Sequence, residues 1–459
     1  MDASPDPEPD PDCRPLAELL RGSPYQGYAY AYPHKTAYRR IDPPKSLADI
    51  WRDEPRDALF LYLHIPFCEM RCGFCNLFTQ SHSRSGLASE TELAYLNALE
   101  RQARVLRDNI PQARYARGAI GGGTPTFLSV AALEKLFALF HSVFAENSGA
   151  RSISVEASPF TATPERLAVL RAHGVTRLSL GVQSFNTAEV SDSGRAQTPS
   201  EVHHALRHIR DAEFPLLNID LIYGLPGQTR ASWLESLQTA LRWEPEELYL
   251  YPLYVRPLTG LARRDSVAEE TDWNELRLAC YRDAREVLLA NGYRALSMRH
   301  FRSTRVTGDP GEYCCQQDGT VALGCGGRSY TRSLHYSNEY AVSSEGVREI
   351  TERYLAASDV DFARVDYGFE LDEREQRRRY AIKSLLRSDG LDLNTYREFF
   401  GSDALSDMPA LVELLEQHLA THNGSTLQPT ARGLEFSDVI GPWLGSTAVQ
   451  QRMKSYSLR

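Results

Sequence analysis

The chain has 459 residues, 42% of them hydrophobic and 24% charged, which is typical of a globular protein large enough for two or three domains. Its formal net charge of -9 excludes the basic surface that nucleic acid or an anionic membrane would require, so we expect neither partner. No apolar run is long enough to span a membrane and no signal peptide is recognisable, which predicts a cytoplasmic protein.

The N-terminal part divides into a tail and a tyrosine-rich segment. Residues 1–14, "MDASPDPEPDPDCR", are rich in Pro and Asp and nearly free of apolar groups, so we expect a disordered tail. Residues 15–55 contain "YAYAYPHKTAYRR", and we expect this segment to lie over the active site. Its basic side chains suit a carboxylate-bearing substrate, with an exposed basic loop as the alternative; they are His34, Lys35, Arg39 and Arg40.

From residue 56 to residue 300, short β-rich runs alternate with amphipathic helical stretches. This alternation predicts parallel strands joined by right-handed crossovers, which close into a barrel or spread into an open sheet. The predicted strands are "LFLYLHI", "ARGAIGGG", "SISVEAS", "RLSLGVQS", "LLNIDLIYG" and "ELYLYPLYV". The predicted helix starts are Ser129, Thr163 before Pro164, Thr198 before Pro199, and Thr229.

Both architectures bring the loops that follow the strands to one face, where ligands bind. A cysteine-containing loop follows the first predicted strand and "GGGTPT" follows the second. Glu156, Gln183 and Asp220 lie at or near the ends of the next three strands. Five separate segments are therefore expected to converge on this one ligand-binding face.

The alternation lapses in the C-terminal third of the chain. We interpret residues 301–365 as a connecting region; it contains Cys314, Cys315 and Cys325, whose irregular spacing favours buried or substrate-side thiols over a second cluster. Residues 366–459 become mainly helical, with a short β-like turn between helices. This order predicts a small winged-helix-like domain.

The stretch "HIPFCEMRCGFC" places Cys68, Cys72 and Cys75 in a C-x3-C-x2-C spacing. Structural zinc normally takes four protein ligands, and the nearby His64 is a poor fourth partner because only Ile-Pro-Phe separates it from Cys68. A [4Fe-4S] cluster held by three cysteines would leave one iron free to bind a substrate. The triplet taken by itself leaves a zinc knuckle or buried thiols as the alternative.

Six motifs in a fixed order resemble the radical S-adenosylmethionine (SAM) superfamily, and within it the family of the oxygen-independent coproporphyrinogen III oxidase. They are "LYLHIPFCEMRCGFC", "GGGTPT", "VEASP", "LSLGVQSF", "GR" at positions 194–195, and "NIDLIYGLPGQT". The resemblance covers about residues 61–229. It implies an α/β fold with a partial, TIM-like βα barrel over residues 56–300.

The resemblance also implies two cofactors and the residues that hold them. Cys68, Cys72 and Cys75 would ligate a [4Fe-4S] cluster whose free iron binds SAM, and one electron would cleave SAM to a 5'-deoxyadenosyl radical. An external electron donor such as a flavodoxin or ferredoxin would be required. The resemblance assigns no residue to the later catalytic steps. It assigns SAM contacts to Tyr62, Phe74, Gly122, Gly123, Thr124, Glu156, Gln183, Arg195, Asp220 and Ile222.

Several of these residues have a plainer alternative. "GGGTPT" lets backbone groups approach the amino-acid end of SAM, or it is only a tight turn. Glu156 would face an ammonium or ribose group, or it caps a strand. Tyr62 and Phe74 are aromatic residues of kinds found more often in a core than at a ligand. Arg299 and His300 could meet an acidic substrate, or they are core residues.

Three subclasses of the family compete. The coproporphyrinogen decarboxylases carry an additional cysteine shortly after the triplet, where this chain has Asn76 and Leu77. We therefore favour the class C methyltransferases and cyclopropane-forming enzymes, which use two SAM molecules on a small-molecule substrate of secondary metabolism, with a partner methyltransferase as a further expectation. The decarboxylating oxidase and a heme chaperone remain the alternatives.

Overall fold

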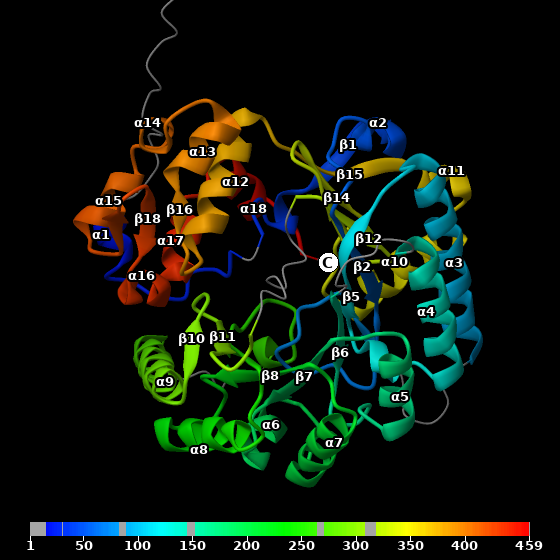
Figure 1. The fold of residues 1–459 in the computed structure, drawn as a ribbon, viewed down its shortest axis with the longest axis horizontal. Helices are drawn as coiled ribbons and strands as arrows, with labels where there is room; N and C mark the ends of the chain where they lie inside the picture. Colours follow the sequence, from blue (N-terminus) through cyan, green and yellow to red (C-terminus); the bar gives the residue numbers. More distant parts are fainter. Residues whose placement is uncertain are drawn as a thin grey trace, which may run out of the picture. The chain divides into compact units, whose positions relative to one another are not determined.

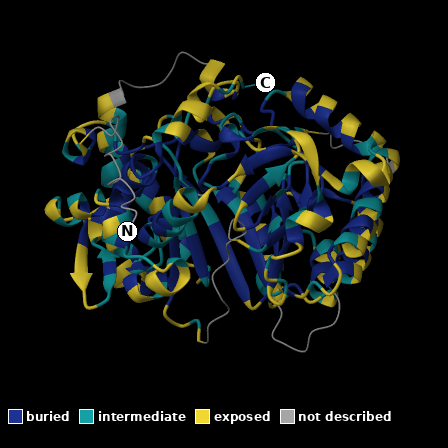
Figure 2. Cartoon of the chain, turned by 90° about the horizontal axis from the view of Figure 1, so that it is seen from above, coloured by how far each residue is buried: buried dark blue, intermediate teal, exposed yellow. Residues whose placement is uncertain are grey.

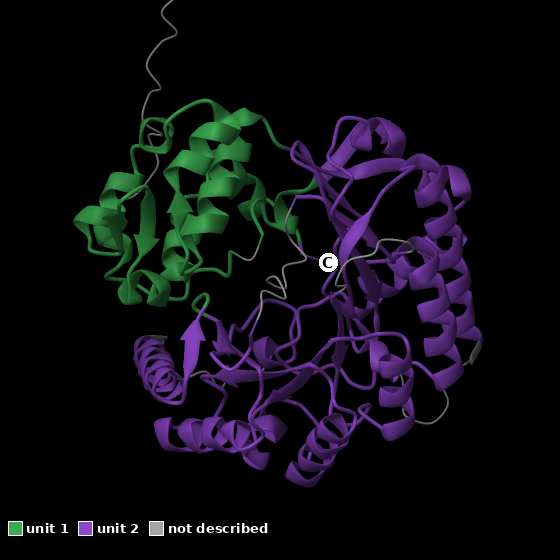
Figure 3. Cartoon of the chain, viewed as in Figure 1, with its two compact units in different colours: residues 1–38, 296–298, 371–457 green, residues 39–295, 299–370, 458–459 purple. Residues whose placement is uncertain are grey.

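A computed structural model describes residues 15–29, 31–81, 89–144, 152–263, 270–307 and 318–458. The predicted tail and the pair Cys314 and Cys315 therefore lie outside the described residues. The chain forms two compact units (Figure 3). The larger comprises residues 39–295 and 299–370, and the smaller comprises the N-terminal residues up to 38 with residues 296–298 and 371–457.

The larger unit is built on one sheet of 13 strands (Figure 1). Seven neighbouring strands run parallel, in the order β12-β2-β5-β6-β7-β8-β9. The six that follow one another along the chain are β2 (Leu59–Ile65), β5 (Tyr115–Gly122), β6 (Ser152–Ala157), β7 (Arg177–Gln183), β8 (Leu216–Tyr223) and β9 (Glu247–Pro252). These six strands and the α/β fold class confirm the sequence prediction.

Helices connect the parallel strands and cover the outer face of the sheet (Figure 1). Their start signals act as predicted: the Thr198 hydroxyl accepts from the Glu201 amide in a capping box, and Thr229 forms another with Ser232. Ser129 accepts from the Ala132 amide at 3.3 Å. The helices are α3 (Ser89–Asn109), α4 (Val130–Phe144), α5 (Pro164–Ala172), α6 (Thr187–Asp192), α7 (Pro199–Asp211), α8 (Arg230–Leu241) and α9 (Glu270–Ala290).

The parallel strands of the larger unit are buried almost throughout (Figure 2). β2 has one partly exposed position, Tyr62, and β8 also has one, Asp220. Parallel strands covered on both faces normally read as continuous apolar runs. A partly exposed polar residue inside such a strand therefore marks where the sheet borders accessible space.

The expected domain boundaries differ from the structure in two places. Residues 15–38 belong to the smaller unit, whereas β1 (Arg39–Ser46) and α2 (Leu47–Trp51) belong to the larger. Residues 301–365, expected as a connector, add strands to the main sheet and the helices α10 (Ser344–Ala356) and α11 (Asp359–Phe362). The added strands are β11 (His300–Ser303), β12 (Thr320–Leu323), β13 (Arg328–Tyr330), β14 (Leu334–Ser337) and β15 (Arg364–Glu370); β10 (Tyr293–Ala295), which precedes this range, pairs with β11 in the same sheet. Most have three or four residues, too few to show a period in sequence.

The smaller unit combines short helices with the three-stranded sheet β16-β18-β17. The N-terminal helix α1 (Leu16–Leu19) belongs to it. Its other elements are α12 (Glu373–Leu385), β16 (Leu391–Asp392), α13 (Leu393–Phe400), α14 (Ala404–Asp407), α15 (Leu411–Glu416), β17 (Ala420–Asn423), β18 (Thr426–Pro429), α16 (Ala431–Glu435), α17 (Ser437–Trp443) and α18 (Thr447–Lys454). Helices followed by a β-hairpin agree with the predicted winged-helix-like order.

Candidate active site

The three cysteines lie on the loop that leaves β2. Cys68 ends the two-residue strand β3 (Phe67–Cys68), and the Cys75 amide donates to the Cys72 carbonyl in a tight turn. Gly73 anchors the turn, because its amide donates to the Ser193 carbonyl at 2.8 Å. A Cβ at this position would lie 2.7 Å from that oxygen, so the backbone approaches too closely for any other residue.

Hydrogen-bond donors surround the three sulfurs. Arg195 Nη1 donates to Cys72 Sγ at 3.2 Å, and Thr124 Oγ1 lies 3.1 Å from Cys68 Sγ. Thr79 Oγ1 is 3.8 Å from Cys75 Sγ. Burial raises the pKa of Cys68 to about 12, and the charge of Glu69 adds to this rise. Such thiols ionise when they bind a metal, and donors to their sulfurs then stabilise the thiolates.

His64 is not placed to be a fourth ligand. Its Nε2 lies 2.9 Å from the Phe78 carbonyl oxygen and its Nδ1 lies 3.4 Å from the Tyr62 hydroxyl. Among the residues that the structure describes, no three His, Cys, Asp or Glu side chains are grouped so that they could hold one metal ion. In a cubane cluster each thiolate binds a different iron. Three thiols from one loop therefore fit a [4Fe-4S] cluster better than a zinc ion.

The glycine-rich loop after β5 packs against the cysteine loop. The Gly123 amide donates to the Ile65 carbonyl and the Thr124 amide to the Phe67 carbonyl. A Cβ on Gly123 would lie 2.4 Å from the Phe67 oxygen, so only glycine permits this contact. These amides therefore bind the protein itself, and the loop holds the cysteine loop in place besides offering backbone to a ligand.

Two carboxylates, one on β6 and one on β8, point to the inner face of the sheet, which is the face that the helices do not cover. Glu156 accepts from the Gly122 amide at 3.1 Å, and Asp220 accepts from Asn218 Nδ2 at 2.8 Å and from Ser179 Oγ at 3.1 Å. Burial raises the pKa of Glu156 to about 7, and the charge of Asp220 contributes to the rise. Burial also raises the pKa of Asp220. A cationic ligand would stabilise the ionised form of both groups.

We expect the affinity for SAM to increase as the pH rises through about 7. The resemblance places Glu156 beside the ammonium or ribose group of SAM. If it faces the ammonium group, only the ionised carboxylate would attract that group, so affinity should change by up to about tenfold per pH unit below the pKa. Equilibrium dialysis of SAM against the reconstituted protein at several pH values measures this. Glu156→Gln should flatten the dependence; an unchanged slope in that variant would show that another group titrates.

Arg195 and Gln183 lie beside the cysteine loop. Arg195 is buried and is fully engaged by protein atoms: Nη2 donates to the Gly181 carbonyl at 2.5 Å and Nε to Gln197 Oε1 at 2.8 Å, in addition to the contact with Cys72. The resemblance assigns Arg195 to SAM, and in the structure its guanidinium group also donates to the sulfur of Cys72. Gln183 ends β7 with a φ of 69° at an irregularity in the pairing with β8, which turns it out of the regular strand.

An apolar cluster lies beyond the carboxylates. Its buried members are Ile222, Leu225, Leu253 and Leu261, and the partly buried Phe74, Tyr251, Val255 and Trp273 pack against it. The structure thus brings together Phe74 and Ile222, which are 148 positions apart in the sequence. Sequence reasoning missed Tyr251 and Leu253, although Tyr251 follows the alternation of β9.

The partly exposed strand positions form one stripe along the interior of the sheet. We call Tyr62, Glu156, Gly181, Gln183, Asp220, Tyr249 and Tyr251 the interior stripe. Four of its seven members are residues that the sequence analysis singled out. Gly181 on β7 and Tyr249 and Tyr251 on β9 are the three additions, and none of them was expected.

Comparison with known proteins agrees with this site. Residues 62–240 match the family described as Radical SAM superfamily. The chain is 35% identical over 198 residues to the heme chaperone HemW of Bacillus subtilis (43% of this chain and 51% of that protein). It is 33% identical over 247 residues to the oxygen-independent coproporphyrinogen III oxidase of Salmonella typhimurium (54% of this chain and 53% of that protein). The chain thus spans about half the length of these curated relatives.

One solved structure extends the likeness to nearly the whole fold. The coproporphyrinogen III oxidase (HemN) from Escherichia coli, described as a radical SAM enzyme, has a TM-score of 0.77 at 23% identity, covering 94% of this chain and 98% of that one. None of the helices described here is long and apolar enough to cross a membrane. Residues 62–240 are therefore a radical SAM domain, and the proteins that this chain resembles include oxygen-independent coproporphyrinogen III oxidases and heme chaperones.

Proposed function

We propose that this radical SAM enzyme oxidises a small-molecule substrate by removing a hydrogen atom, in the manner of the coproporphyrinogen III oxidases. The observation that carries the proposal is the arrangement of three thiols on one loop beside an interior stripe with two acidic side chains. When bound, a [4Fe-4S] cluster and SAM would supply a 5'-deoxyadenosyl radical. The interior of the sheet would keep that radical away from water.

The residues of the chain have distinct tasks in this proposal. Cys68, Cys72 and Cys75 hold the cluster, and Arg195 donates to one of their sulfurs. Glu156 presents a carboxylate to the ammonium group of SAM. The other residues assigned to SAM would take its remaining groups; they are Tyr62, Phe74, Gly122, Gly123, Thr124, Gln183, Asp220 and Ile222.

The relatives favour oxidation over the methyl transfer that the sequence analysis preferred. The curated oxidase is 33% identical to this chain, and a decarboxylating oxidase would remove hydrogen from a propionate side chain of a coproporphyrinogen-type substrate. One observation still favours a class C methyltransferase or cyclopropane-forming enzyme as second candidate, because Asn76 and Leu77 stand where the decarboxylases have an additional cysteine.

The products of SAM distinguish these functions. The protein is reconstituted with iron and sulfide without oxygen, reduced, and incubated with SAM and coproporphyrinogen III. Formation of 5'-deoxyadenosine together with CO2 supports the oxidase. 5'-Deoxyadenosine together with S-adenosylhomocysteine supports methyl transfer, and tight heme binding with no cleavage of SAM supports a chaperone. Absence of both SAM cleavage and heme binding would overturn the proposal.

A further inference from the structure

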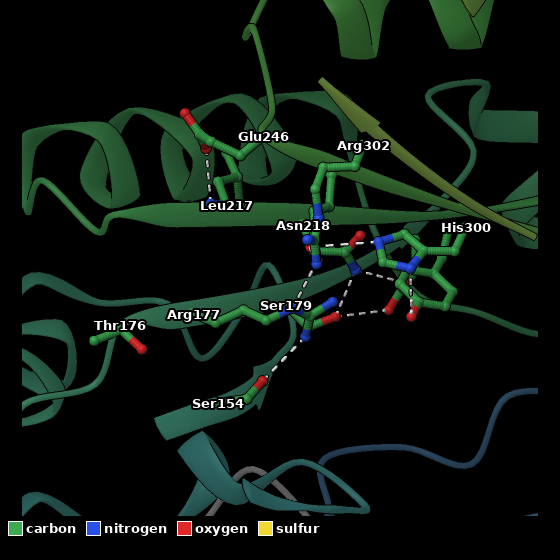
Figure 4. A network of polar contacts seen from close by, with 12 residues as sticks. Ser154, Thr176, Arg177, Ser179, Leu217, Asn218, Glu246, His300 and Arg302 are labelled. Carbon is green, nitrogen blue, oxygen red and sulfur yellow. Dashed lines mark hydrogen bonds and ion pairs between the residues drawn. The ribbon is translucent and has the colours of Figure 1, made fainter. Parts of the chain in front are cut away.

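A buried network of charges lies under the interior stripe. Glu247, at the start of β9, is fully buried and accepts from Arg177 Nε at 2.8 Å and from Arg302 Nε at 2.9 Å. Arg177 Nη1 also donates to Ser154 Oγ at 3.0 Å. Figure 4 shows Arg177, from β7, converging with His300 and Arg302, which both lie on β11. One carboxylate thus faces two guanidinium groups within the core.

His300 is the fourth member of this network, and its surroundings favour the neutral imidazole. Its Nε2 lies 3.3 Å from Glu247 Oε1. Burial lowers the pKa of His300, and the two nearby guanidinium groups lower it further although Glu247 opposes this. The carboxylate is ionised, because Arg177, His300 and Arg302 hold its pKa well below the usual range despite burial. We assign the proton of the neutral imidazole to Nε2, because this nitrogen is the one near the ionised carboxylate.

This tautomer determines what Tyr249 offers to the interior. Nδ1 of His300 carries a lone pair and lies 3.2 Å from the Tyr249 hydroxyl, so the hydroxyl donates to Nδ1. The two rings stack at 4.4 Å, and Arg177 Cζ lies 5.8 Å from the centre of the tyrosine ring. The Tyr249 ring is thus held in place, and its hydroxyl proton is engaged by Nδ1 of His300. A phenolic oxygen has two lone pairs, so a hydroxyl that donates its proton can also accept a hydrogen bond from a ligand.

Tyr249 and Asp220 form a pair of acceptors on neighbouring strands. They are paired across β8 and β9, so their side chains point to the same face with backbones about 4.8 Å apart. Both are partly exposed members of the interior stripe. Two residues beyond Tyr249, Tyr251 packs against the apolar cluster that includes Phe74. Two oxygen acceptors beside an apolar, aromatic-lined surface fit a nucleoside, with its sugar diol on the acceptors and its base on the cluster.

We propose that Tyr249 contacts SAM by accepting a hydrogen bond from a ribose hydroxyl next to Asp220, and that His300 and Glu247 are positioning residues for it. This inference rests on the proposed function, since it requires SAM to occupy the interior stripe. It also explains why a charge network is buried in the core. The network fixes the histidine tautomer, and the tautomer directs the tyrosine proton away from the ligand.

Tyr249→Phe removes the acceptor and keeps the ring. We expect the dissociation constant of SAM to rise about three- to tenfold in equilibrium dialysis, which is the effect of one hydrogen bond. Adenosine, 2'-deoxyadenosine and 3'-deoxyadenosine then serve as competitors. One of the two deoxynucleosides lacks the ribose hydroxyl that would donate to Tyr249. The wild type and Tyr249→Phe should bind that deoxynucleoside equally well. Tyr293→Phe is the matched control. Tyr293 lies on the edge strand β10, and its hydroxyl donates to the carbonyl of Pro245.

Two substitutions of His300 separate positioning from folding. Asn at this position places its amide oxygen near the site of Nδ1, so His300→Asn should keep the Tyr249 contact and bind SAM within about twofold of wild type. Gln places its amide near the site of Nε2, so His300→Gln should lose that contact and match Tyr249→Phe. Thermal unfolding of both variants shows whether they fold equally well.

The outcomes distinguish this inference from the proposed function. If the wild type binds SAM and Tyr249→Phe binds SAM and all three nucleosides as the wild type does, the assignment of Tyr249 is overturned and the proposed function stands. The same holds if His300→Asn and His300→Gln, equally stable, weaken SAM binding equally. If the wild type binds a cluster but no SAM, both are overturned.

Discussion

Replacing Cys72 by Ala is expected to abolish the brown colour and reduce bound iron to background after anaerobic reconstitution. Cys72 is the buried member of the triplet and the one whose sulfur accepts from Arg195. A cubane cluster with only two protein thiolates loses a ligand that no described side chain can replace, since His64 is engaged elsewhere. Iron and sulfide analysis, together with the visible absorption spectrum, measures the loss.

Cys280→Ala is the matched control for this variant. Cys280 is also buried, but it lies on α9 and outside the cysteine loop, so its removal should leave the iron content unchanged. Full iron content in Cys72→Ala would refute the assignment of the cluster ligands. If both variants lost iron equally, the cause would be damage to the fold and not the loss of a cluster ligand.

Replacing Glu247 by Ala is expected to destabilise the larger unit by about 3–5 kcal/mol, because it leaves the buried guanidinium groups of Arg177 and Arg302 without their carboxylate. Few single substitutions cost this much. Urea denaturation followed by circular dichroism at constant pH measures the change in the unfolding midpoint. The same variant should also lose SAM affinity if enough folded protein remains.

An exposed ion pair provides the comparison. Glu244 pairs with Arg305 at 2.7 Å, and both side chains are more than half exposed, so Glu244→Ala should leave the unfolding midpoint nearly unchanged. Glu244 precedes Glu247 by only three positions, which keeps the two variants in the same part of the sheet. Equal midpoints for the two variants would contradict the view that the buried network stabilises the larger unit.

Much of the larger unit could be predicted from sequence because its signals are local. The six parallel strands are buried on both faces and therefore read as apolar runs, and the helices between them begin at capping residues such as Thr198 and Thr229. The cysteine spacing and the glycines of the next loop are equally local. Their chemistry follows from residue type, and the close approach of Gly123 to Phe67 explains why glycine is required.

The sequence by itself therefore determined the fold class, the resemblance to the radical SAM superfamily and the placement of three thiols on one loop. Only the tertiary structure decided that residues 301–365 continue the main sheet, that Arg195 contacts a thiol, and that Tyr249 joins the interior stripe. These features depend on pairing between distant segments: β11 meets β9 antiparallel and brings His300 beside Tyr249. The partners of single residues such as Glu247 and His300 cannot be predicted from a sequence pattern, because their role comes from the three-dimensional arrangement of charges around them.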